Sequence, residues 1–425
     1  MKKVKLVAMF LAMVLVLGSL VGCAQKQVDK QDDAQETVSI TIMHYMGEQS
    51  KRETLNAIVE AFEKANPGIK VKLEQIDSSE VYQTYQTRFN TGDAPDVLFG
   101  SPREMIEFVE AGLFMDLTGA DFLDKIVDEV LEETTVDGKY YAVPIDVQIK
   151  GVFYNKNMFA AQNLNVPTTL DEFKAVLTAF NDAGITPLIH DYAFTWAPYH
   201  ELDTILTSMC ATRGGGNLLM DSQNGVAQLT GNDTALEAAT MWNLIASYKE
   251  DQDLTMDQPT AVERFAAGDR PMFINGGWIY ADVVAASEDE FGFFPVPWSN
   301  TASENKLEVA LDDAFIVNNT TQHKDEVFAF LSYMMSDEAA EMWMTGTKLM
   351  SSSKNADANN VDPYVQAIKS YIDAGNIAAK ANVPDYTAAY SDAQISVMQS
   401  YIVQNMNDPA LFLKMLDDEI ALCNK

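Results

Sequence analysis

Apolar and polar positions alternate along the start of the folded chain, and the period then changes. From residue 38 to residue 42 apolar side chains stand at every second position, which is the spacing of a half-buried strand. From Leu55 they recur at offsets of three, four and seven, which predicts an amphipathic helix that ends at the NPG sequence of 66–68. A second alternating run occupies 69–73. This order of strand, helix and strand predicts a βαβ unit with parallel strands.

Four capping boxes, each a Ser or Thr followed three residues later by Glu, predict further helix starts. They begin at Ser50, Ser101, Thr169 and Thr260, and another amphipathic helix is predicted around Val327. Short apolar strands are predicted in APDVLFG and in PMFIN. The repeated alternation of strands and helices predicts an α/β fold with open sheets, and a mature chain of about 400 residues predicts two domains.

In open α/β sheets, ligands bind beyond the carboxyl ends of the strands. Four short segments of this chain follow predicted strands and carry polar, aromatic or glycine residues. These candidates are Tyr45, Glu48, Gly100, Ser101, Gly277, Trp278, Asp312 and Asp313.

Aromatic side chains in loop-like settings are a second signal. Trp278 follows a strand and two glycines, a setting in which a ligand could approach the ring closely. Trp196 and Tyr199 flank a proline in FTWAPYH, and Tyr45 and Tyr390 also lie outside helix-period stripes. The apolar face of a sugar ring packs on such side chains, while carboxylates and amides bind its hydroxyl groups. A place in the core is the alternative for each of these rings.

The first 22 residues have the pattern of an export signal. Three lysines precede an unbroken apolar run from Leu6 to Leu17, which is too short to cross a bilayer as a helix. The LVGC sequence ending at Cys23 resembles a bacterial lipobox, which implies cleavage before this cysteine and its attachment to lipid. An ordinary signal peptide is the alternative. Residues 23–37 are polar and lack aromatic side chains, as in a disordered tether.

The charge of the chain excludes some partners. The formal net charge is −33, and it becomes −36 once the three lysines of residues 1–22 are removed. Such acidity argues against nucleic acid as a partner and against electrostatic attachment to anionic lipid. We therefore expect the lipid on Cys23 to hold the protein at the membrane.

Patterns of catalysis and metal binding are missing from the sequence. Pairs of acids such as Glu132–Glu133 arise by chance among 62 acidic residues, so they do not indicate a glycosidase. The four histidines lack metal-ligand spacing, and neither a CxxC, a GxSxG nor a P-loop motif occurs. We expect no catalytic residue, no metal and no cofactor. Cys210 and Cys423 are expected to be free and buried, with a disulfide as the alternative.

Seven segments, taken together and in order, resemble the landmarks of family 1 extracellular solute-binding proteins. Among them are TGDAPDVLFG, DGKYYAVPIDVQIKGVFYNKNMF, VPTTLDEFKAVLTAF, RFAAGDRPMFINGGW and FIVNNTTQHKDEVFAFLSYMMS. The similarity spans about residues 38–350. Within the family, the sequence most resembles the branch that includes maltose-binding protein. Members of this family are receptors of ABC importers, lipid-anchored or periplasmic.

The resemblance implies two α/β lobes that close around a solute by hinge motion. The first lobe would hold residues 38–146 and 306–349, and the second would hold 147–305 and 350–425. The hinge would run near Ile145–Lys150, Ser303–Leu307 and Lys348–Ser352. The family also implies a monomer whose closed cleft is recognised by a membrane permease.

The resemblance assigns ligand contacts residue by residue. Trp278 matches the tryptophan of the family's NG-x-W sequence, which stacks on sugar, and Gln148 and Asp146 match polar contacts at the hinge. Gly100 and Ser101 match a loop in which the maltose-binding branch has an aromatic residue, so the glycine makes a maltose-like stack doubtful. The remaining assignments are Gly277, Trp196, Tyr199, Tyr45, Glu48, Asp312, Asp313 and Tyr390.

The sequence as a whole predicts a lipid-anchored receptor on the outer face of the cell membrane, not an enzyme. Its ligand is predicted to be a mono- or oligosaccharide, because carboxylates and amides beside aromatic rings suit polyhydroxyl recognition. Two alternatives stay open. Carboxylates also bind cations, so the solute could be a polyamine, and an exported carbohydrate-active enzyme is the alternative from another class.

Overall fold

The computed structural model describes residues 37–214, 216, 218–356, 362–379 and 388–423. The predicted export signal, Cys23 and all of the predicted tether except Thr37 lie outside these residues. Among the described residues, no helix is long and apolar enough to span a membrane.

The first sheet has five strands in the order β2-β1-β3-β12-β6. β1 pairs in parallel with β2 and with β3, and β12 pairs antiparallel with β3 and β6. The predicted βαβ unit is therefore confirmed. The bounds of these strands are β1 Val38–His44, β2 Ile69–Gln75, β3 Val97–Phe99, β6 Ala142–Pro144 and β12 Ala314–Val317.

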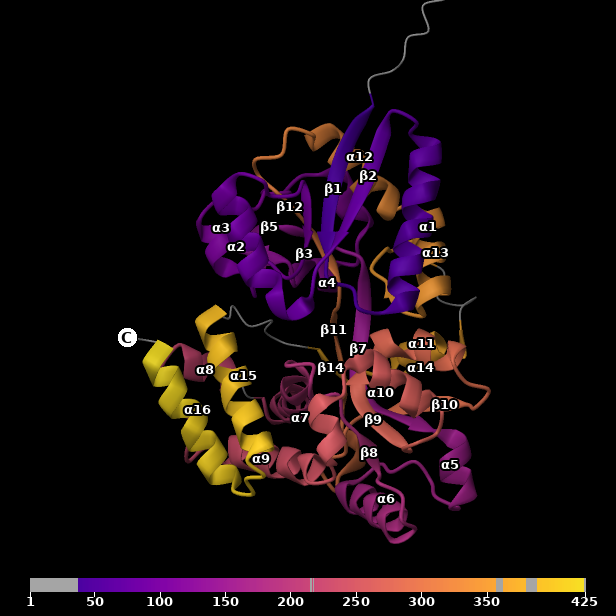
Figure 1. Ribbon diagram of the computed structural model, residues 1–425, viewed down its shortest axis with the longest axis vertical. Coiled ribbons are helices and arrows are strands. Elements are labelled where there is room, and N and C mark those ends of the chain that lie inside the picture. The colour runs from indigo at the N-terminus through magenta and orange to yellow at the C-terminus, as the bar shows by residue number, and fades with distance from the viewer. Residues whose placement is uncertain (1–36, 215, 217, 357–361, 380–387, 424–425) are drawn as a thin grey trace, which may run out of the picture. The chain divides into compact units, whose positions relative to one another are not determined.

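Helices cover both faces of this sheet. Leu55, Ile58 and Phe62 of α1 pack with α12 and α13 against one face, while Tyr85 of α2 and Phe108 of α3 lie in the core of the other. Figure 1 shows α1 and α13 side by side at one flank and α2 and α3 at the opposite flank. The elements are α1 Gln49–Ala65, η1 Ser78–Glu80, α2 Val81–Thr91, α3 Ile106–Glu110, η2 Asp121–Lys125, α4 Asp128–Glu132, β4 Thr135–Val136, β5 Lys139–Tyr140, α12 Lys324–Met334 and α13 Asp337–Thr347.

The second sheet has seven strands around the ten-residue strand β7. Its main order is β14-β11-β7-β9-β8, and β10 and β13 also pair with β7. β7 is antiparallel to β9, β10, β11 and β13. The bounds are β7 Asp146–Asn155, β8 Leu188–Ile189, β9 Met272–Gly276, β10 Phe291–Phe294, β11 Leu307–Leu311, β13 Met350–Ser351 and β14 Ile377–Ala379.

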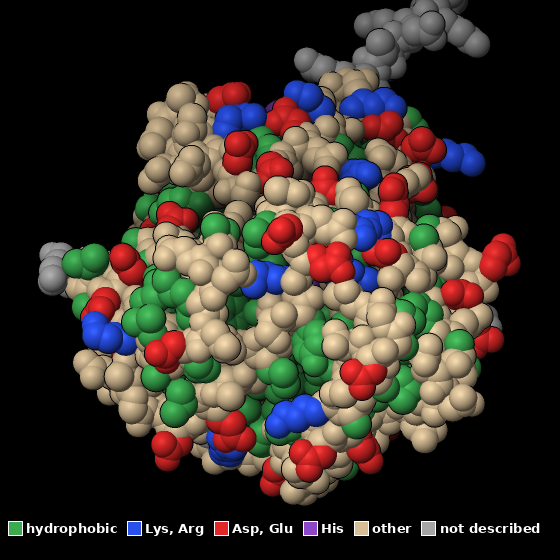
Figure 2. Space-filling model, turned by 60° about the horizontal axis from the view of Figure 1, so that its bottom comes forward, with side chains coloured by type: hydrophobic (Ala, Val, Ile, Leu, Met, Phe, Trp, Pro, Cys, Tyr) green, Lys and Arg blue, Asp and Glu red, His purple; other side chains and the backbone are tan. Residues whose placement is uncertain are grey.

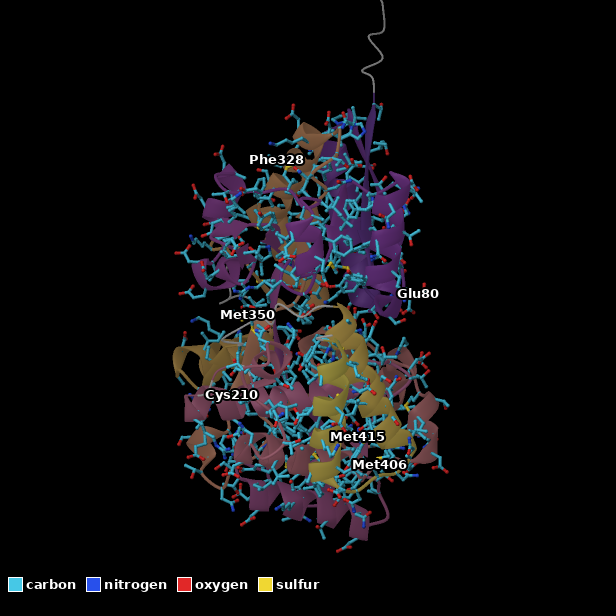
Figure 3. The ribbon with its side chains drawn as sticks, turned by 90° about the vertical axis from the view of Figure 1, so that its left-hand side faces the viewer. Glu80, Cys210, Phe328, Met350, Met406 and Met415 are labelled. Carbon is cyan, nitrogen blue, oxygen red and sulfur yellow. The ribbon has the colours of Figure 1, made fainter. Side chains whose placement is uncertain are left out.

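Two hydrophobic cores flank the second sheet. One contains residues of α10, α11 and α14, and the other contains residues of α6, α7, α9, α15 and α16. Figure 3 labels Met406 and Met415, which pack against the second of these cores. The elements are α5 Lys156–Ala161, α6 Leu170–Asp182, α7 Ala197–Arg213, α8 Leu218–Gln223, α9 Asp233–Ala246, η3 Asp251–Thr255, α10 Gln258–Ala266, η4 Gly277–Ile279, α11 Tyr280–Ala285, η5 Ala302–Glu304, α14 Pro363–Asp373, α15 Ala388–Val403 and α16 Pro409–Cys423.

The chain passes between the two sheets at three places. β6 of the first sheet leads through Ile145 into β7 of the second, and β11 leads through Asp312–Asp313 back to β12. After α13 the chain enters β13, on which Figure 3 labels Met350. Because Leu307–Leu311 pairs with β7, the second crossing lies after β11 rather than near Ser303–Leu307. The predicted lobe boundaries otherwise stay a prediction.

One of the four predicted capping boxes is confirmed. The Thr169 side chain accepts from the Glu172 backbone and Glu172 reaches back, so α6 begins where predicted. The other three do not begin a helix at the predicted residue. α1 begins at Gln49 without a side-chain cap from its own N-cap residue, and α10 is capped by Asp257. The Ser101 side chain does accept from the Glu104 backbone at 3.4 Å, but it caps a turn, and α3 begins only at Ile106. Short capping patterns recur by chance, and the cap that forms depends on which acceptor the folded chain brings to the helix end.

Both described cysteines are free, as predicted. Cys210 is partly buried on α7, but Cys423 is exposed, so the expected burial is wrong for the second thiol. Cys423 lies in the last turn of α16, where only one face of the helix packs on the core.

Basic side chains form no single patch on the face shown in Figure 2, where they are scattered among acidic ones. This distribution matches the acidic composition, and it offers no surface on that face for a polyanion.

Candidate ligand-binding site

Trp278 lies just beyond the carboxyl end of β9, where the sequence places it. The side chain belongs to the core beside α10 and α11, yet 7 % of the residue remains exposed. The edge of its ring meets His200 of α7 at 5.4 Å between centroids. With the Gln258 amide oriented so that both of its polar atoms are satisfied, its oxygen accepts from Trp278 Nε1 at 3.1 Å and its nitrogen donates to Glu48 Oε1 at 3.0 Å. Gln258 thus links the indole of Trp278 to Glu48, which lies between β1 and α1.

The two glycines before Trp278 make room for side chains of the protein itself. A Cβ on Gly276 would lie 2.0 Å from the Trp278 ring, and a Cβ on Gly277 would lie 2.6 Å from the Tyr364 hydroxyl. The expectation that these glycines open a path for a ligand is therefore corrected, because the space is already filled. They fix how the indole folds back over the strand end.

A row of aromatic rings continues from Trp278 along the start of α7. His200 lies 5.9 Å from Tyr199, and Tyr199 meets the Trp196 ring edge-on at 5.8 Å. The FTWAPYH segment stands here because Trp196 is the N-cap residue of α7 and Pro198 lies in its first turn. We call Trp278, His200, Tyr199 and Trp196 the aromatic row.

Tyr45 lies at the end of β1, with its ring edge against Phe99 at 6.2 Å. Burial raises the pKa of Tyr45 well above its ordinary value, and the negative charges of Asp313 and Glu104 add to this. Burial also raises the pKa of Tyr199, and Asp203 and Glu104 add to it. The charge of Glu104 thus raises the pKa of both hydroxyls.

Gln148 is the third residue of β7, and it has an acceptor that no described residue satisfies. The residue is only 7 % exposed, and its Oε1 atom has no hydrogen-bond partner. A buried carbonyl oxygen without a donor is costly, so this atom calls for a hydroxyl or amino group from outside the chain. It is the strongest polar candidate among the predicted contacts.

Asp146 has a structural role instead. It is fully buried, and its two oxygens accept from the backbone of Asp313 at 3.0 Å and from Trp343 Nε1 at 2.8 Å. Burial raises the pKa of Asp146 well above its ordinary value, and Asp313 and Asp312 add to the shift. The carboxyl therefore ties both crossing strands to α13, which favours this structural role over ligand binding.

Lys51 of α1 lies between the two neighbouring acids at the crossing. Its Nζ atom is 2.6 Å from Asp312 Oδ2 and 2.6 Å from Asp313 Oδ2, and the lysine is only 3 % exposed. Burial alone would lower the pKa of Lys51, but the carboxylates of Asp312 and Asp313 raise it well above its ordinary value. Among the described residues, one set of carboxyl groups lies close enough together to hold a metal ion, and it consists of Asp146, Asp312 and Asp313. The ammonium group of Lys51 already supplies a positive charge to Asp312 and Asp313.

The remaining predicted contacts separate into two groups. Ser101 stays partly exposed in the loop after β3, and Gly100 is required there, because its φ of 148° and a 2.7 Å approach to Met105 Cε exclude other side chains. Tyr390 is 1 % exposed in the core around α15, where its hydroxyl donates to the Leu219 carbonyl at 2.8 Å. The structure thus gives Tyr390 a core position, in the same hydrophobic core as Tyr199.

The free energy of unfolding is expected to fall as pH rises from about 5.5 to about 7.5. Burial raises the pKa of Glu48 and of Asp191 to about 7, and that of Asp312 to about 6. At pH 5.5 the unfolded chain has already released these protons, since ordinary carboxyl pKa values lie at about 4, while the folded chain still binds part of them. The free energy of unfolding therefore falls until the pH passes the folded pKa values of about 6 to 7 and then levels off. Burial lowers the pKa of His44 to about 4, which opposes the trend with one group, while the raised pKa of Asp146 adds a fourth group to the three acids. Urea unfolding at both pH values measures the difference, and equal stability would contradict this account.

Sequence reasoning missed Lys51, Gln258 and His200. Lys51 does carry a signal, because it precedes Thr54, Leu55 and Ile58 on the apolar face of α1 at offsets of three, four and seven. A lysine in that register predicts a buried charge that needs a partner. Gln258 and His200 carry none, since their importance depends on contacts between segments distant in the chain.

The fold consists of two sheets with helices on their faces, and the chain crosses between them three times. This is the two-lobe fold of periplasmic binding proteins. Residues 48–341 match the model of the family described as bacterial extracellular solute-binding protein. The chain therefore belongs to that family. Its members are transport receptors, so the alternative of a carbohydrate-active enzyme is wrong.

Individual relatives are similar over most of the chain. The multiple sugar-binding protein of Streptococcus mutans serotype c is 28 % identical over 312 residues, which cover 72 % of this chain and 73 % of the relative. The diacetylchitobiose binding protein DasA of Streptomyces coelicolor is 26 % identical, with 94 % and 91 % covered. The solved structure of the solute-binding protein RafE with raffinose matches with a TM-score of 0.77 at 23 % identity, covering 92 % of this chain and 100 % of that one. This last likeness shows the fold.

Proposed function

We propose that the protein binds a mono- or oligosaccharide beside the crossings and delivers it to the permease of an ABC importer. The observation that carries this proposal is the aromatic row on α7 and η4, two elements that contact β7, on which the buried acceptor of Gln148 has no partner within the described residues. Aromatic faces bind the C–H faces of sugar rings, and a lone acceptor is satisfied by a sugar hydroxyl.

The relatives support a saccharide as the solute. The names of two of them specify sugars and diacetylchitobiose, and the RafE structure holds raffinose. These ligands are all built from sugar rings, although they differ in composition and length. A similar class of ligand is the simplest proposal for this chain, and the particular sugar is left to experiment.

The proposed contacts follow from the geometry. We assign stacking to Trp278, Trp196 and Tyr199, and hydrogen bonding to Gln148. Tyr45, Glu48 and Ser101 would approach the same ligand from the first lobe. Gly100 and Gly277 shape the backbone, and Asp146, Asp312, Asp313 and Tyr390 support the site through the contacts described above.

A polyamine is the second candidate, because Glu48 and Glu104 border the region. The largest acidic group, however, is already neutralised in part by Lys51. A thermal-shift panel separates the two candidates, since a solute that binds only the folded state raises its midpoint. We expect a shift with at least one of raffinose, diacetylchitobiose and xylo-oligosaccharides, and none with spermidine. A shift with spermidine alone would replace the saccharide by a cation.

Delivery to a permease requires the protein to stay near the membrane. The LVGC sequence at Cys23 supports a lipid anchor, followed by the polar tether of residues 23–37. Exchange of Cys23 for serine is expected to release the protein from the membrane fraction into the soluble fraction, because serine cannot form the thioether to diacylglycerol. Immunoblots of fractionated cells measure this, with Cys210→Ser as the matched control. Retention of the Cys23→Ser protein in membranes would refute the anchor.

A further inference from the structure

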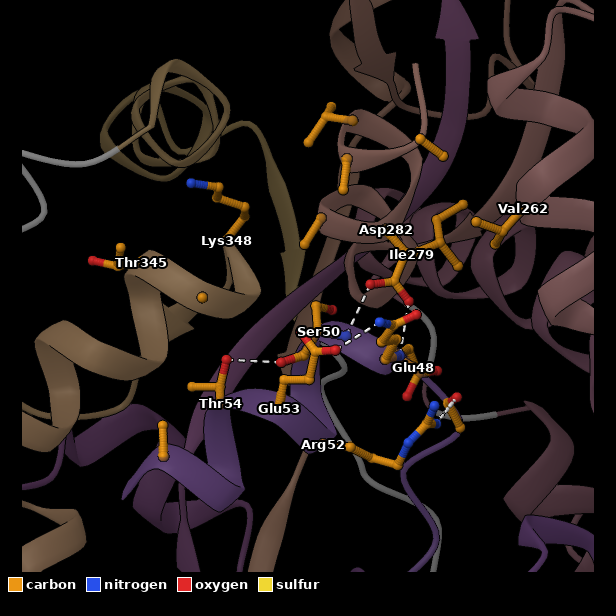
Figure 4. A pocket seen from close by; sticks show the side chains of 18 of the residues that line it. Glu48, Ser50, Arg52, Glu53, Thr54, Val262, Ile279, Asp282, Thr345 and Lys348 are labelled. Atoms are coloured by element: carbon orange, nitrogen blue, oxygen red, sulfur yellow. Dashed lines mark hydrogen bonds between the residues drawn. The ribbon is translucent and has the colours of Figure 1, made fainter. Parts of the chain in front are cut away.

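The first turn of α1 is capped by a carboxylate from the other lobe. Asp282 of α11 accepts from the backbone N–H of Gln49 through Oδ2 at 2.9 Å, and from that of Ser50 through Oδ1 at 2.9 Å. These residues are more than 230 positions apart in the chain. Figure 4 shows the Asp282 side chain reaching down to the start of α1.

No residue next to α1 supplies this cap. Its N-cap residue, Glu48, makes no side-chain bond to the helix and there is no acidic residue in the first turn. The first N–H groups of a helix have no partner within it and carry partial positive charge. A carboxylate that accepts from two of them replaces the usual local cap, and it does so only while the two lobes are together.

The contact crosses a hollow between the lobes. Residues of α1 and α13 line one side of this hollow, and residues of α10 and α11 line the other, around a volume of about 1210 Å³. Asp282 and the start of α1 both belong to its wall, as Figure 4 shows.

We propose that Asp282 is a positioning residue for solute capture, which holds the lobes together by capping α1 across the hollow. It lies four residues after Trp278, and Gln258 links Trp278 to Glu48, the residue before α1. The same lobe contact therefore also orders the wall on which stacking is proposed. The role of Asp282 in solute capture rests on the proposed function, whereas the contact between the lobes needs no solute.

Small-angle X-ray scattering without any added solute tests the contact. Asp282→Ala is expected to lower the ratio of joined to separated lobes about fivefold, the typical effect of losing a helix N-cap, and thus to raise the radius of gyration. The radius of gyration of the Asp282→Asn protein is expected to lie between those of the wild type and of Asp282→Ala, because the amide oxygen of asparagine can accept from only one of the two N–H groups. Glu263→Ala is the matched control, since Glu263 lines the same hollow and is exposed.

Gln49→Pro removes one of the two donors from the opposite lobe and leaves α11 unchanged. Glu48 has an extended backbone with ψ of 132°, so a proline at the first helical position fits without strain. We expect Gln49→Pro to raise the radius of gyration without lowering the melting temperature. Adding Asp282→Ala to it should then have a smaller effect than in the wild type.

A radius of gyration that stays at the wild-type value in both Asp282→Ala and Gln49→Pro would overturn the inference. Full additivity of the two changes would do the same, because independent effects exclude a shared contact. Neither result would touch the saccharide proposal, which depends on binding assays. Conversely, a failure to bind any saccharide would leave the scattering result standing.

Discussion

Exchange of Lys51 for methionine is expected to lower the free energy of unfolding by about 3–5 kcal/mol. The substitution keeps the unbranched side chain up to the ε position and removes the ammonium group, which leaves Asp312 and Asp313 without their cation in a buried place. A buried ion pair broken on one side is costly, since the remaining charge is neither solvated nor compensated. Urea unfolding at neutral pH measures the change.

The controls separate charge from packing. Lys64→Met changes the same residue type at an exposed position of the same helix, and it is expected to cost less than about 1 kcal/mol. Adding Asp312→Asn and Asp313→Asn to Lys51→Met should restore part of the lost stability, because the uncompensated charges are then gone. A Lys51→Met protein as stable as the Lys64→Met protein would show that the acids do not depend on the lysine.

Exchange of Trp278 for alanine is expected to weaken saccharide binding at least about thirtyfold. Trp278 supplies one of the two indole rings of the proposed site, and its loss also frees the Gln258 amide that links it to Glu48. Calorimetric titration with the saccharide that gives the largest thermal shift measures the affinity.

Stability has to be controlled in this experiment, because Trp278 is mostly buried and its truncation also leaves a cavity. Trp298 offers the match. It is 3 % exposed, and its Nε1 atom donates to Ser208 in the core of the second lobe. Trp298→Ala should lower the melting temperature to a similar degree and leave the affinity unchanged. If Trp278→Ala and Trp298→Ala lost affinity equally, the role of Trp278 would be purely structural.

Local periodicity predicted the elements, and it succeeded where burial follows from neighbouring residues. The alternation at 38–42 became β1, and Phe173, Val176, Leu177 and Phe180 all became buried on α6. In both cases the pattern within one segment decides which face is buried.

Long-range pairing limited what the sequence could say about the site. The sequence assigned Asp146 to the hinge and the two acids after β11 only to a strand end, and it did not show that their partners Lys51 and Trp343 come from α1 and α13. The capping box at Ser50 failed for a similar reason, because the cap of α1 arrives from Asp282. A short pattern cannot show which distant acceptor the fold brings to a helix end. The aromatic row, by contrast, could be predicted in part, since Trp196 and Tyr199 lie in one segment.

The central claim is tested most directly by equilibrium titration of the purified chain with the saccharide selected by thermal shift. Chromatography of the recovered sugar then shows whether the sugar is unchanged. We predict saturable binding of one saccharide per chain, with the sugar recovered intact and the affinity reduced in the Trp278→Ala protein. Absence of binding to every saccharide of the panel, together with saturable binding of spermidine, would contradict the claim that this receptor captures a carbohydrate.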